Sequence, residues 1–434
     1  MPANTTLLRP TARKEATAPD PQFRVTVGDL QLGAREKEYL GQVIDSNRLS
    51  YGPFTRRFEE LFAAEHDCQF AVFCNSGTSA LHISLAALKE LHGWEDGDEV
   101  LVPAVTFIAT SNVVLHNRMT PVFVDVDPLT YNIDPALIEA KITPKTRAIL
   151  PVHLLGLPAD MGAIDEIARR RGLRVIEDSC ETMFANCRGR KVGSWGDIGC
   201  FSTYIAHYIV TGVGGFATTN DPDLAVMLKS LMNHGRDSIY LSIDDDDGVK
   251  GKALFEIAAR RFRFVHVGHS FRCTEMEAAI GLAQLERKDD IIARRVGVAR
   301  RYRDRLAGLA DVLQLPTVPA DRDHVFMLFP LVLREGSKRE LVNHLESNGI
   351  ETRDLLPLIN QPIYKKMFGD LEPYYPVARW LNESGFYIGC HQSITDDGVD
   401  HVVDKLYEFF GRKAGANFFP RLAIFDPTAA EAVR

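Results

Sequence analysis

The chain lacks the features that mark several large classes of protein. No apolar run approaches the roughly 18–20 residues that a membrane-spanning helix needs, and the N-terminus has no apolar core typical of a secretory signal. Positive charge is not in excess, because 50 Lys and Arg residues are set against 58 Asp and Glu residues. The net charge of −8 argues against charge-driven binding to nucleic acid. We therefore expect a cytoplasmic protein that binds neither membranes nor nucleic acid.

Cysteine is also scarce, and its distribution excludes two kinds of cross-linked fold. The count of seven is odd, the positions are widely scattered, and no two cysteines have the CxxC spacing. A disulfide scaffold and a closed zinc site are therefore not expected, and buried reduced thiols are. The positions are Cys68, Cys74, Cys180, Cys187, Cys200, Cys273 and Cys390.

The length of 434 residues, with 45% hydrophobic and 25% charged residues, suits a large globular domain followed by a smaller one. We expect a flexible arm over residues 1–22, a large domain over 23–290, a small domain over 291–412 and a tail over 413–434. The insertion 238–266 and the tail receive no assigned role.

Short apolar segments alternate with amphipathic helices through the first two thirds of the chain, which predicts an α/β fold with a mostly parallel sheet. The predicted strands are 69–73, 99–102, 121–125, 148–152 and 173–176, and the predicted helices are 80–91 and 161–171. A long helix is expected over 275–292, continuing to about 309, and 325–333 is the clearest strand of a smaller α/β unit. Ligands of such sheets bind beyond the carboxyl ends of the strands, where Ser76, Gly77, Thr78, Thr106, His153 and Asp178 are expected.

Two of these strand ends carry residues that could take part in binding or catalysis. Ser76, Gly77 and Thr78 form a small-residue turn before a helix, where backbone N–H groups and the helix dipole attract anions such as phosphate. Many ordinary turns look the same. Asp178 and Glu181 follow a buried strand, where the alternative is a solvent-facing strand end.

A third segment carries a more specific pattern. Residues 200–207 read Cys-Phe-Ser-Thr-Tyr-Ile-Ala-His and are followed by Thr-Gly-Val-Gly-Gly at 211–215. This frame resembles the cofactor-lysine segment of the DegT/DnrJ/EryC1/StrS sugar aminotransferases, in which the residue five places after the serine is the lysine that holds pyridoxal phosphate (PLP). The resemblance covers about residues 23–410 and implies PLP fold type I. His207 occupies the lysine position.

The resemblance implies a role for each matching residue of the site. Contacts to the cofactor phosphate are implied for Ser76, Gly77, Thr78 and Ser202. Asp178 matches the aspartate that holds the proton on the pyridine nitrogen, which makes the ring an electron sink. Glu181 is implied near the ring O3′.

Two further positions are implied less directly. Phe107 matches the aromatic residue that stacks on the cofactor, although an ordinary core phenylalanine is the alternative. Ser270 stands where the family has an asparagine that reaches the phosphate of the neighbouring subunit, and serine is shorter.

A histidine at position 207 changes the chemistry that the resemblance implies. An imidazole forms no stable imine, but it exchanges protons near neutral pH; the alternative is a structural histidine. Histidine here is similar to the family's 3-dehydratases, which act on nucleotide sugars and hold pyridoxamine phosphate (PMP) non-covalently. Their CDP-sugar type carries a [2Fe–2S] cluster on four cysteines, of which only Cys180 is matched, while Ser238 and Tyr240 occupy two other places. We predict no iron–sulfur cluster and no metal.

The resulting hypothesis is a PMP-dependent dehydratase that removes the C3 hydroxyl of a nucleotide-activated 4-keto-6-deoxy sugar, with His207 as acid and base. The family implies a homodimer and glutamate as amino donor. The first alternative is a nucleotide-sugar aminotransferase, in which His207 is natural or an engineered replacement of lysine. A cofactor-binding protein without enzymatic activity is the second.

Overall fold

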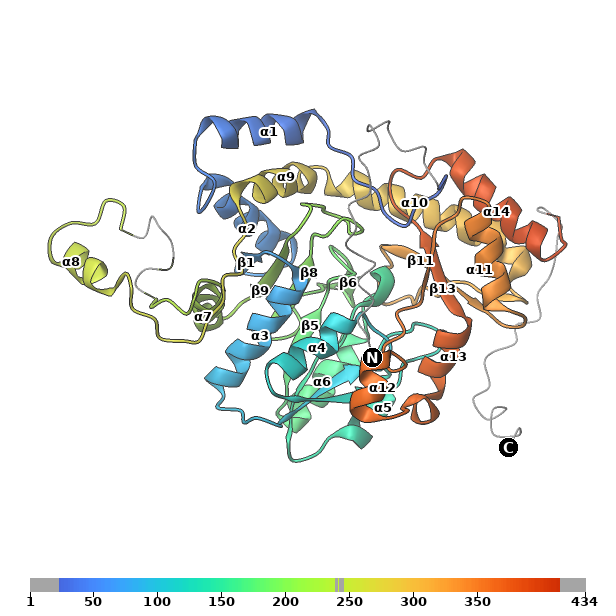
Figure 1. Ribbon diagram of the computed structural model, residues 1–434, viewed down its shortest axis with the longest axis horizontal. Coiled ribbons are helices and arrows are strands. Elements are labelled where there is room, and N and C mark those ends of the chain that lie inside the picture. The colour runs from blue at the N-terminus through green and yellow to red at the C-terminus, as the bar shows by residue number, and fades with distance from the viewer. Residues whose placement is uncertain (1–22, 239–240, 242–245, 414–434) are drawn as a thin grey trace, which may run out of the picture.

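A seven-stranded sheet forms the centre of the first two thirds of the chain in the computed structural model, which describes residues 23–238, 241 and 246–413 (Figure 1). The predicted arm 1–22, nearly all of the tail and part of the insertion lie outside the described residues. The strands are β1 (Phe70–Cys74), β2 (Glu99–Pro103), β3 (Thr120–Val124), β4 (Thr146–Ile149), β5 (Arg174–Asp178), β8 (Ile198–Ser202) and β9 (Gly215–Thr219).

The sheet order is β1-β9-β8-β5-β4-β2-β3, and β9 is the one strand that runs antiparallel to its neighbours. The prediction of a mostly parallel α/β sheet is therefore confirmed. The predicted strand 148–152 is shifted towards the N-terminus, since β4 begins at Thr146 and already ends at Ile149. Pro151 has no N–H to donate to a strand ladder, which explains the early end.

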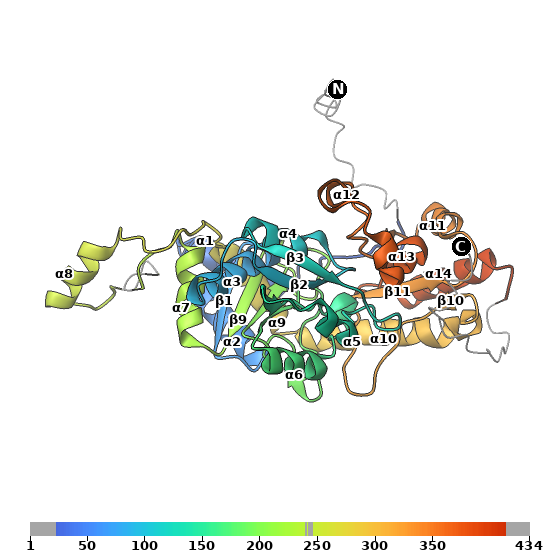
Figure 2. The ribbon, with the colours of Figure 1, turned by 90° about the horizontal axis from the view of Figure 1, so that it is seen from below.

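Helices cover both faces of this sheet, with α3 and α4 on one side and α6 on the other (Figure 2). Helix α3 also packs against α7, and α2 against α9. A two-stranded hairpin, β6 (Asn186–Cys187) and β7 (Arg190–Lys191), lies outside the main sheet. The helices are α1 (Ala34–Asp45), α2 (Pro53–Glu65), α3 (Gly77–Leu91), α4 (Ile108–His116), α5 (Pro135–Ile138), α6 (Met161–Arg171), α7 (Pro222–Met232), α8 (Gly251–Arg260) and α9 (Glu275–Leu285).

The remainder of the chain forms a four-stranded antiparallel sheet of order β10-β11-β13-β12 with its own apolar core. This second core supports a domain division near residue 290, which stays a prediction. The elements are α10 (Lys288–Leu306), β10 (Leu313–Gln314), β11 (Leu328–Leu333), α11 (Lys338–Ser347), β12 (Thr352–Asp354), α12 (Pro362–Phe368), α13 (Pro376–Ser384), β13 (Gly385–Gly389) and α14 (Asp396–Phe409).

Two predicted elements of this region are wrong in extent. The long helix over 275–309 is broken at Glu286 and Arg287 into α9 and α10, and Asp289 and Asp290 stand in the first turn of α10, where the helix dipole favours carboxylates. The strand predicted over 325–333 begins only at 328. The N–H groups of Val325 and Met327 instead donate to carbonyls at Gly156 and Leu155 of the large domain.

An arm that contains α8 stands away from the rest of the molecule (Figures 1 and 2). Arg260 pairs with Asp237 and Arg261 with Asp246 nearby in the chain, whereas His266 contacts Glu90 of α3. Large apolar side chains are exposed along the arm, including Phe255, Phe262 and Val267. Exposed apolar groups of this size are typical of an interaction surface.

A buried carboxylate after β3 fastens the two parts of the chain together. The two carboxylate oxygens of Asp125 accept hydrogen bonds from the N–H groups of Val377 (3.0 Å) and Ala378 (2.9 Å) in the first turn of α13. We expect Asp125→Ala to lower the free energy of unfolding in urea by about 1–2 kcal/mol, the usual cost of a lost helix cap. Asp134→Ala, which removes an exposed cap of the one-turn α5, is the control, and an equal loss there would contradict an interdomain role for Asp125.

Candidate functional site

The carboxyl ends of neighbouring strands bring most of the predicted site residues to one edge of the sheet. Strands β5 and β8 are adjacent and parallel, and they end at Asp178 and Ser202. Strand β1 ends at Cys74, and the chain then enters α3 with Ser76 as its N-cap. Phe107, the N-cap of α4, follows β2.

Asp178 presents a buried carboxylate that has no cationic partner among the described residues. Its Oδ2 accepts a hydrogen bond from the Thr110 hydroxyl (2.7 Å), and its Oδ1 accepts one from the N–H of Cys180 (3.1 Å). Burial raises the pKa of Asp178, because desolvation disfavours the charged form. A positively charged N–H placed here would stabilise the carboxylate, as the protonated pyridine nitrogen of the cofactor would.

Glu181 lies near Asp178 and is held by the backbone of another loop. Its Oε2 accepts a hydrogen bond from the N–H of Leu155 (2.9 Å), and its own carbonyl accepts one from the hydroxyl of Tyr208 (3.2 Å). Burial, with a smaller effect from the charge of Asp178, raises the pKa of Glu181 to about 7. Near neutral pH its carboxyl group can therefore either donate or accept a proton.

The first turn of α3 packs closely against the end of β8 and the residues that follow β5. The Ser76 hydroxyl accepts a hydrogen bond from the N–H of Ser79 (3.0 Å), which leaves Gly77 and Thr78 as the first two residues of the helix. A Cβ atom at Gly77 would lie 2.7 Å from the Cys180 sulfur and 2.8 Å from Cβ of Ser202. The glycine therefore allows the helix N-terminus to meet the ends of β5 and β8, and the helix dipole gives this junction a preference for anions such as phosphate.

Phe107 is not a core residue, so the alternative of ordinary packing is wrong. Its side chain is 58% exposed, although it follows directly from a buried strand. An exposed aromatic ring just after a strand end suits stacking on a planar ligand.

His207 lies in the turn that follows β8 and is partly buried. Its N–H (2.9 Å) and its Nδ1 (3.1 Å) both approach the Tyr204 carbonyl. A carbonyl oxygen only accepts, so Nδ1 carries the hydrogen and Nε2 keeps the basic lone pair. Burial first, and the charge of Arg295 as a smaller cause, lower the pKa of His207 to about 4, against the opposing effect of the Tyr204 hydrogen bond.

The other polar residues predicted at the strand ends have structural partners. His153 is buried, donates from Nε2 to Glu177 (3.0 Å) and accepts at Nδ1 from the N–H of Ala159 (3.0 Å). Thr106 shares a hydrogen bond of 2.8 Å with Thr110 and so supports Asp178 indirectly. Sequence reasoning missed Thr110, and also Arg295, whose guanidinium contacts the His207 carbonyl. Nothing in the local sequence of either residue distinguishes it.

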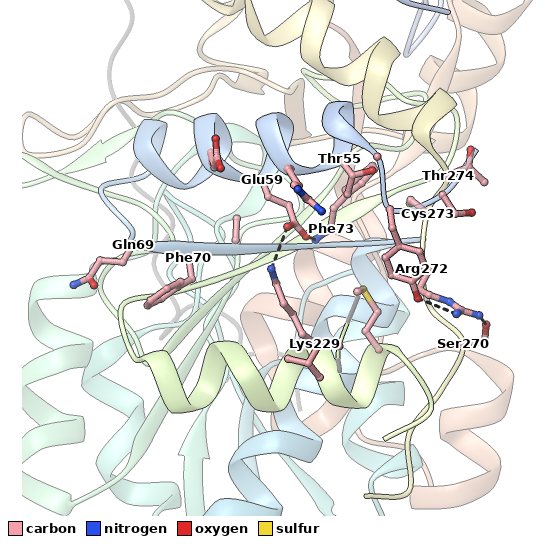
Figure 3. Close-up of a pocket in the computed structure, with 18 residues that line it drawn as sticks. Thr55, Glu59, Gln69, Phe70, Phe73, Lys229, Ser270, Arg272, Cys273 and Thr274 are labelled. Atoms are coloured by element: carbon pink, nitrogen blue, oxygen red, sulfur yellow. Dashed lines mark hydrogen bonds and ion pairs between the residues drawn. The ribbon is translucent and has the colours of Figure 1, made fainter. Parts of the chain in front are cut away.

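Ser270 does not join this cluster within one chain. Its hydroxyl accepts a hydrogen bond from Arg272 (2.9 Å) and lines a pocket of about 840 Å³ beside β1 (Figure 3). Helices α2 and α7 flank this pocket, and the ion pair of Glu59 with Lys229 crosses it. None of the other predicted site residues lines it.

The described residues contain no group of three or more His, Cys, Asp or Glu side chains placed to hold a metal ion. No helix in this part of the chain is both long and apolar enough to cross a membrane. The residues at the strand ends fit PLP or PMP by their chemistry, because they offer an anion-binding helix start, an exposed aromatic face and a buried carboxylate without a cation.

Comparisons of this chain with a family model, with single sequences and with solved structures agree with one another. The DegT/DnrJ/EryC1/StrS aminotransferase family matches residues 30–407. GDP-perosamine synthase of Caulobacter vibrioides is 38% identical over 388 residues, which are 88% of this chain and 97% of that protein. The structure of E. coli GDP-4-keto-6-deoxy-D-mannose-3-dehydratase with bound hydrated PLP shares 27% identity, with a TM-score of 0.78 over 88% of this chain and 99% of the other.

A further structure of that dehydratase carries asparagine in place of a histidine and holds bound GDP-perosamine. It has the same identity and TM-score, and the match covers 88% of this chain and all of the other. These likenesses confirm the fold expected from the sequence, a PLP fold type I architecture.

The raised pKa of Glu181 predicts a pH-dependent stability. The folded protein holds this proton up to about pH 7, whereas the unfolded chain releases it near pH 4.5, so stability declines as pH rises through that window. We expect Glu181→Gln to remove up to ~3 kcal/mol of this decline, measured by urea unfolding without cofactor at pH 5 and pH 8. Glu166→Gln, at an exposed carboxylate of α6, is the control, and the same decline in wild type and Glu181→Gln would contradict the assignment.

Proposed function

The chain belongs to the DegT/DnrJ/EryC1/StrS aminotransferase family, and we propose that it is a PMP-dependent dehydratase of nucleotide sugars. Its substrate would be a 4-keto-6-deoxy sugar that loses its C3 hydroxyl group. The observation that carries the proposal is His207, whose basic Nε2 lies in the loop where relatives of this family hold a lysine. None of the described hydrogen bonds and ion pairs of Asp178, Glu181, Ser202 or His207 involves a lysine.

Each part of the site would hold one part of the cofactor. The start of α3 and the Ser202 hydroxyl would bind the phosphate, Asp178 the pyridine nitrogen, and Phe107 the ring face. Glu181 would lie near O3′, where a carboxyl group with a pKa of about 7 can share a proton with the oxygen. When bound, PMP supplies an amine that condenses with the keto group and a ring that accepts electrons.

His207 would move the proton that the reaction requires. Its low pKa leaves Nε2 unprotonated at neutral pH, ready to take a proton from C4′ of the cofactor. The same low pKa makes the protonated ring a strong acid, which favours return of the proton to the departing C3 oxygen. The sugar would lose its C3 oxygen as water and would gain the two electrons that PMP supplies by becoming PLP. The amino nitrogen would leave with the sugar, and hydrolysis would release ammonia and the 3-deoxy ketone. Glutamate is the proposed donor that restores the amine.

We infer a homodimer, because the site of one chain lacks a predicted member. Ser270 faces the pocket beside β1 and not the strand-end cluster, so a second copy would have to bring this residue to a phosphate. The exposed phenylalanines of the α8 arm provide apolar surface for such contacts.

Transamination of the same class of sugar is the second candidate. It is favoured by the 38% identity to GDP-perosamine synthase, an aminotransferase. In transamination the product sugar keeps the amino nitrogen. In dehydration the product is a keto sugar that has lost its C3 oxygen.

Mass spectrometry of the product separates the two reactions. We expect purified protein with PMP, glutamate and GDP-4-keto-6-deoxymannose, or its CDP and dTDP counterparts, to yield a keto sugar lighter by one oxygen. His207→Asn should abolish this conversion while retaining cofactor absorbance, because the phosphate and ring contacts remain. A stable aminated sugar from the wild type would refute dehydration, and a large gain of transamination in His207→Lys would favour a replaced lysine.

A further inference from the structure

Arg295 of α10 is an arginine in the interior of the protein, with a side chain only 1% exposed. Its guanidinium forms no ion pair with a carboxylate in the described part of the chain. Burying a cation without an anionic partner is costly, and burial lowers the pKa of Arg295 itself. A hydrophobic side chain of similar size would fill the space at lower cost, so the charge and its donors need a local reason.

The donors of Arg295 join three segments that are far apart in the sequence. Nη2 donates to the backbone carbonyl of His207 (3.0 Å), and Nη1 donates to the carbonyl of Met327 (2.9 Å) just before β11. Nε donates to the side chain of Gln392 (3.1 Å), which follows β13. The planar, forked guanidinium suits three acceptors in fixed directions, which a lysine ammonium on a flexible stem does not.

Residues adjacent to these acceptors complete the junction. The guanidinium lies over the ring of Tyr208, 4.9 Å from its centroid, and the Tyr208 hydroxyl in turn bonds the Glu181 carbonyl. Cys390 donates from its sulfur to the backbone carbonyl of Arg295 (3.5 Å). The side chain of Arg295 therefore contacts the His207 turn, the segment just before β11 and Tyr208, whose hydroxyl bonds the Glu181 carbonyl.

We propose that Arg295 is a positioning residue that fixes the His207 turn to the small domain and keeps a positive charge beside the imidazole. The proposal rests on the proposed function of His207 as acid and base. The turn is closed internally by the bonds of His207 to the Tyr204 carbonyl and of the Thr211 N–H to the Thr203 carbonyl. The carbonyl contact from Arg295 links it to α10.

The positive charge of Arg295 shifts the pKa of His207 in one direction. A neighbouring cation repels the protonated imidazole, so its removal should raise the pKa of His207, although burial remains the larger cause of the low value. The other titratable groups recorded at this junction are Tyr204, Tyr208, Cys390 and His391, with Glu181 beyond Tyr208. Burial first, and then the charge of Arg295, lower the pKa of His391 to about 4, so none of these groups is a second cation at neutral pH.

Histidine titration tests the proposal on the full chain without cofactor. The protein is labelled with ¹³C at histidine Cε1, and the His207 signal is identified by its loss in His207→Asn. We expect a midpoint well below 6.5 in the wild type, and a midpoint higher by at least about 0.5 pH unit in Arg295→Met, as for removal of a nearby like charge. Arg294→Met is the matched control, because Arg294 also binds a small-domain carbonyl, that of Ile394, but does not touch His207.

Turnover provides a second readout in the cofactor-loaded enzyme. We expect Arg295→Met and Arg295→Lys to lower kcat by about 10- to 100-fold, the effect of a displacement of about 1 Å near the reacting atoms, with KM little changed. Arg295→Lys keeps the charge, so its His207 midpoint should stay close to that of the wild type.

The outcomes separate the positioning role from the proposed function. An unchanged His207 midpoint in Arg295→Met, or wild-type kcat in Arg295→Lys, would overturn the proposal. If circular dichroism shows that Arg295→Met does not fold, Arg295→Gln is titrated in its place, and a His207 midpoint equal to that of the wild type would overturn the proposal. If no keto sugar reacts while the titration behaves as expected, the proposed function fails and the role of Arg295 at His207 stands.

Discussion

The buried carboxylate of Asp178 is the constraint on which the candidate site depends. It lies at the end of a central strand, accepts hydrogen bonds from a hydroxyl and a backbone N–H, and has no cationic partner among the described residues. In this state burial favours its neutral form. A ligand with a protonated ring nitrogen would allow ionisation at low cost, so a cationic heterocycle is the kind of ligand that this carboxylate suits.

The rest of the site forms where the start of α3 packs against the segments around that carboxylate. Gly77 allows the start of α3 to touch the residues after β5 and the last residue of β8, which places an anion-binding helix end beside the acid. The protein therefore offers regions of opposite electrostatic preference a short way apart, as a zwitterionic ligand with a phosphate and a pyridinium group requires. Phe107 adds an exposed aromatic face.

The proposed role of His207 is proton transfer, in a fold that this chain shares with an aminotransferase family. Its tautomer is set by one carbonyl oxygen, and its environment keeps it neutral. A neutral imidazole with Nε2 as the base can accept a proton but cannot anchor a cofactor covalently. Arg295 connects this turn to the small domain, so that the base is held by both parts of the chain.

The sequence by itself determined the α/β class, most strand and helix positions and the set of residues at the strand ends, because apolar periodicity and local turn chemistry are short-range properties. Resemblance to a family added the roles proposed for Asp178, Ser202 and His207. Tertiary structure alone decided that α9 and α10 are separate helices, that 325–327 bond the large domain, that Phe107 is exposed and that Ser270 faces another pocket. It also decided which His207 nitrogen is basic and which arginine supports it. These outcomes depend on contacts between segments as far apart as residues 207 and 295, and local periodicity carries no information about such contacts.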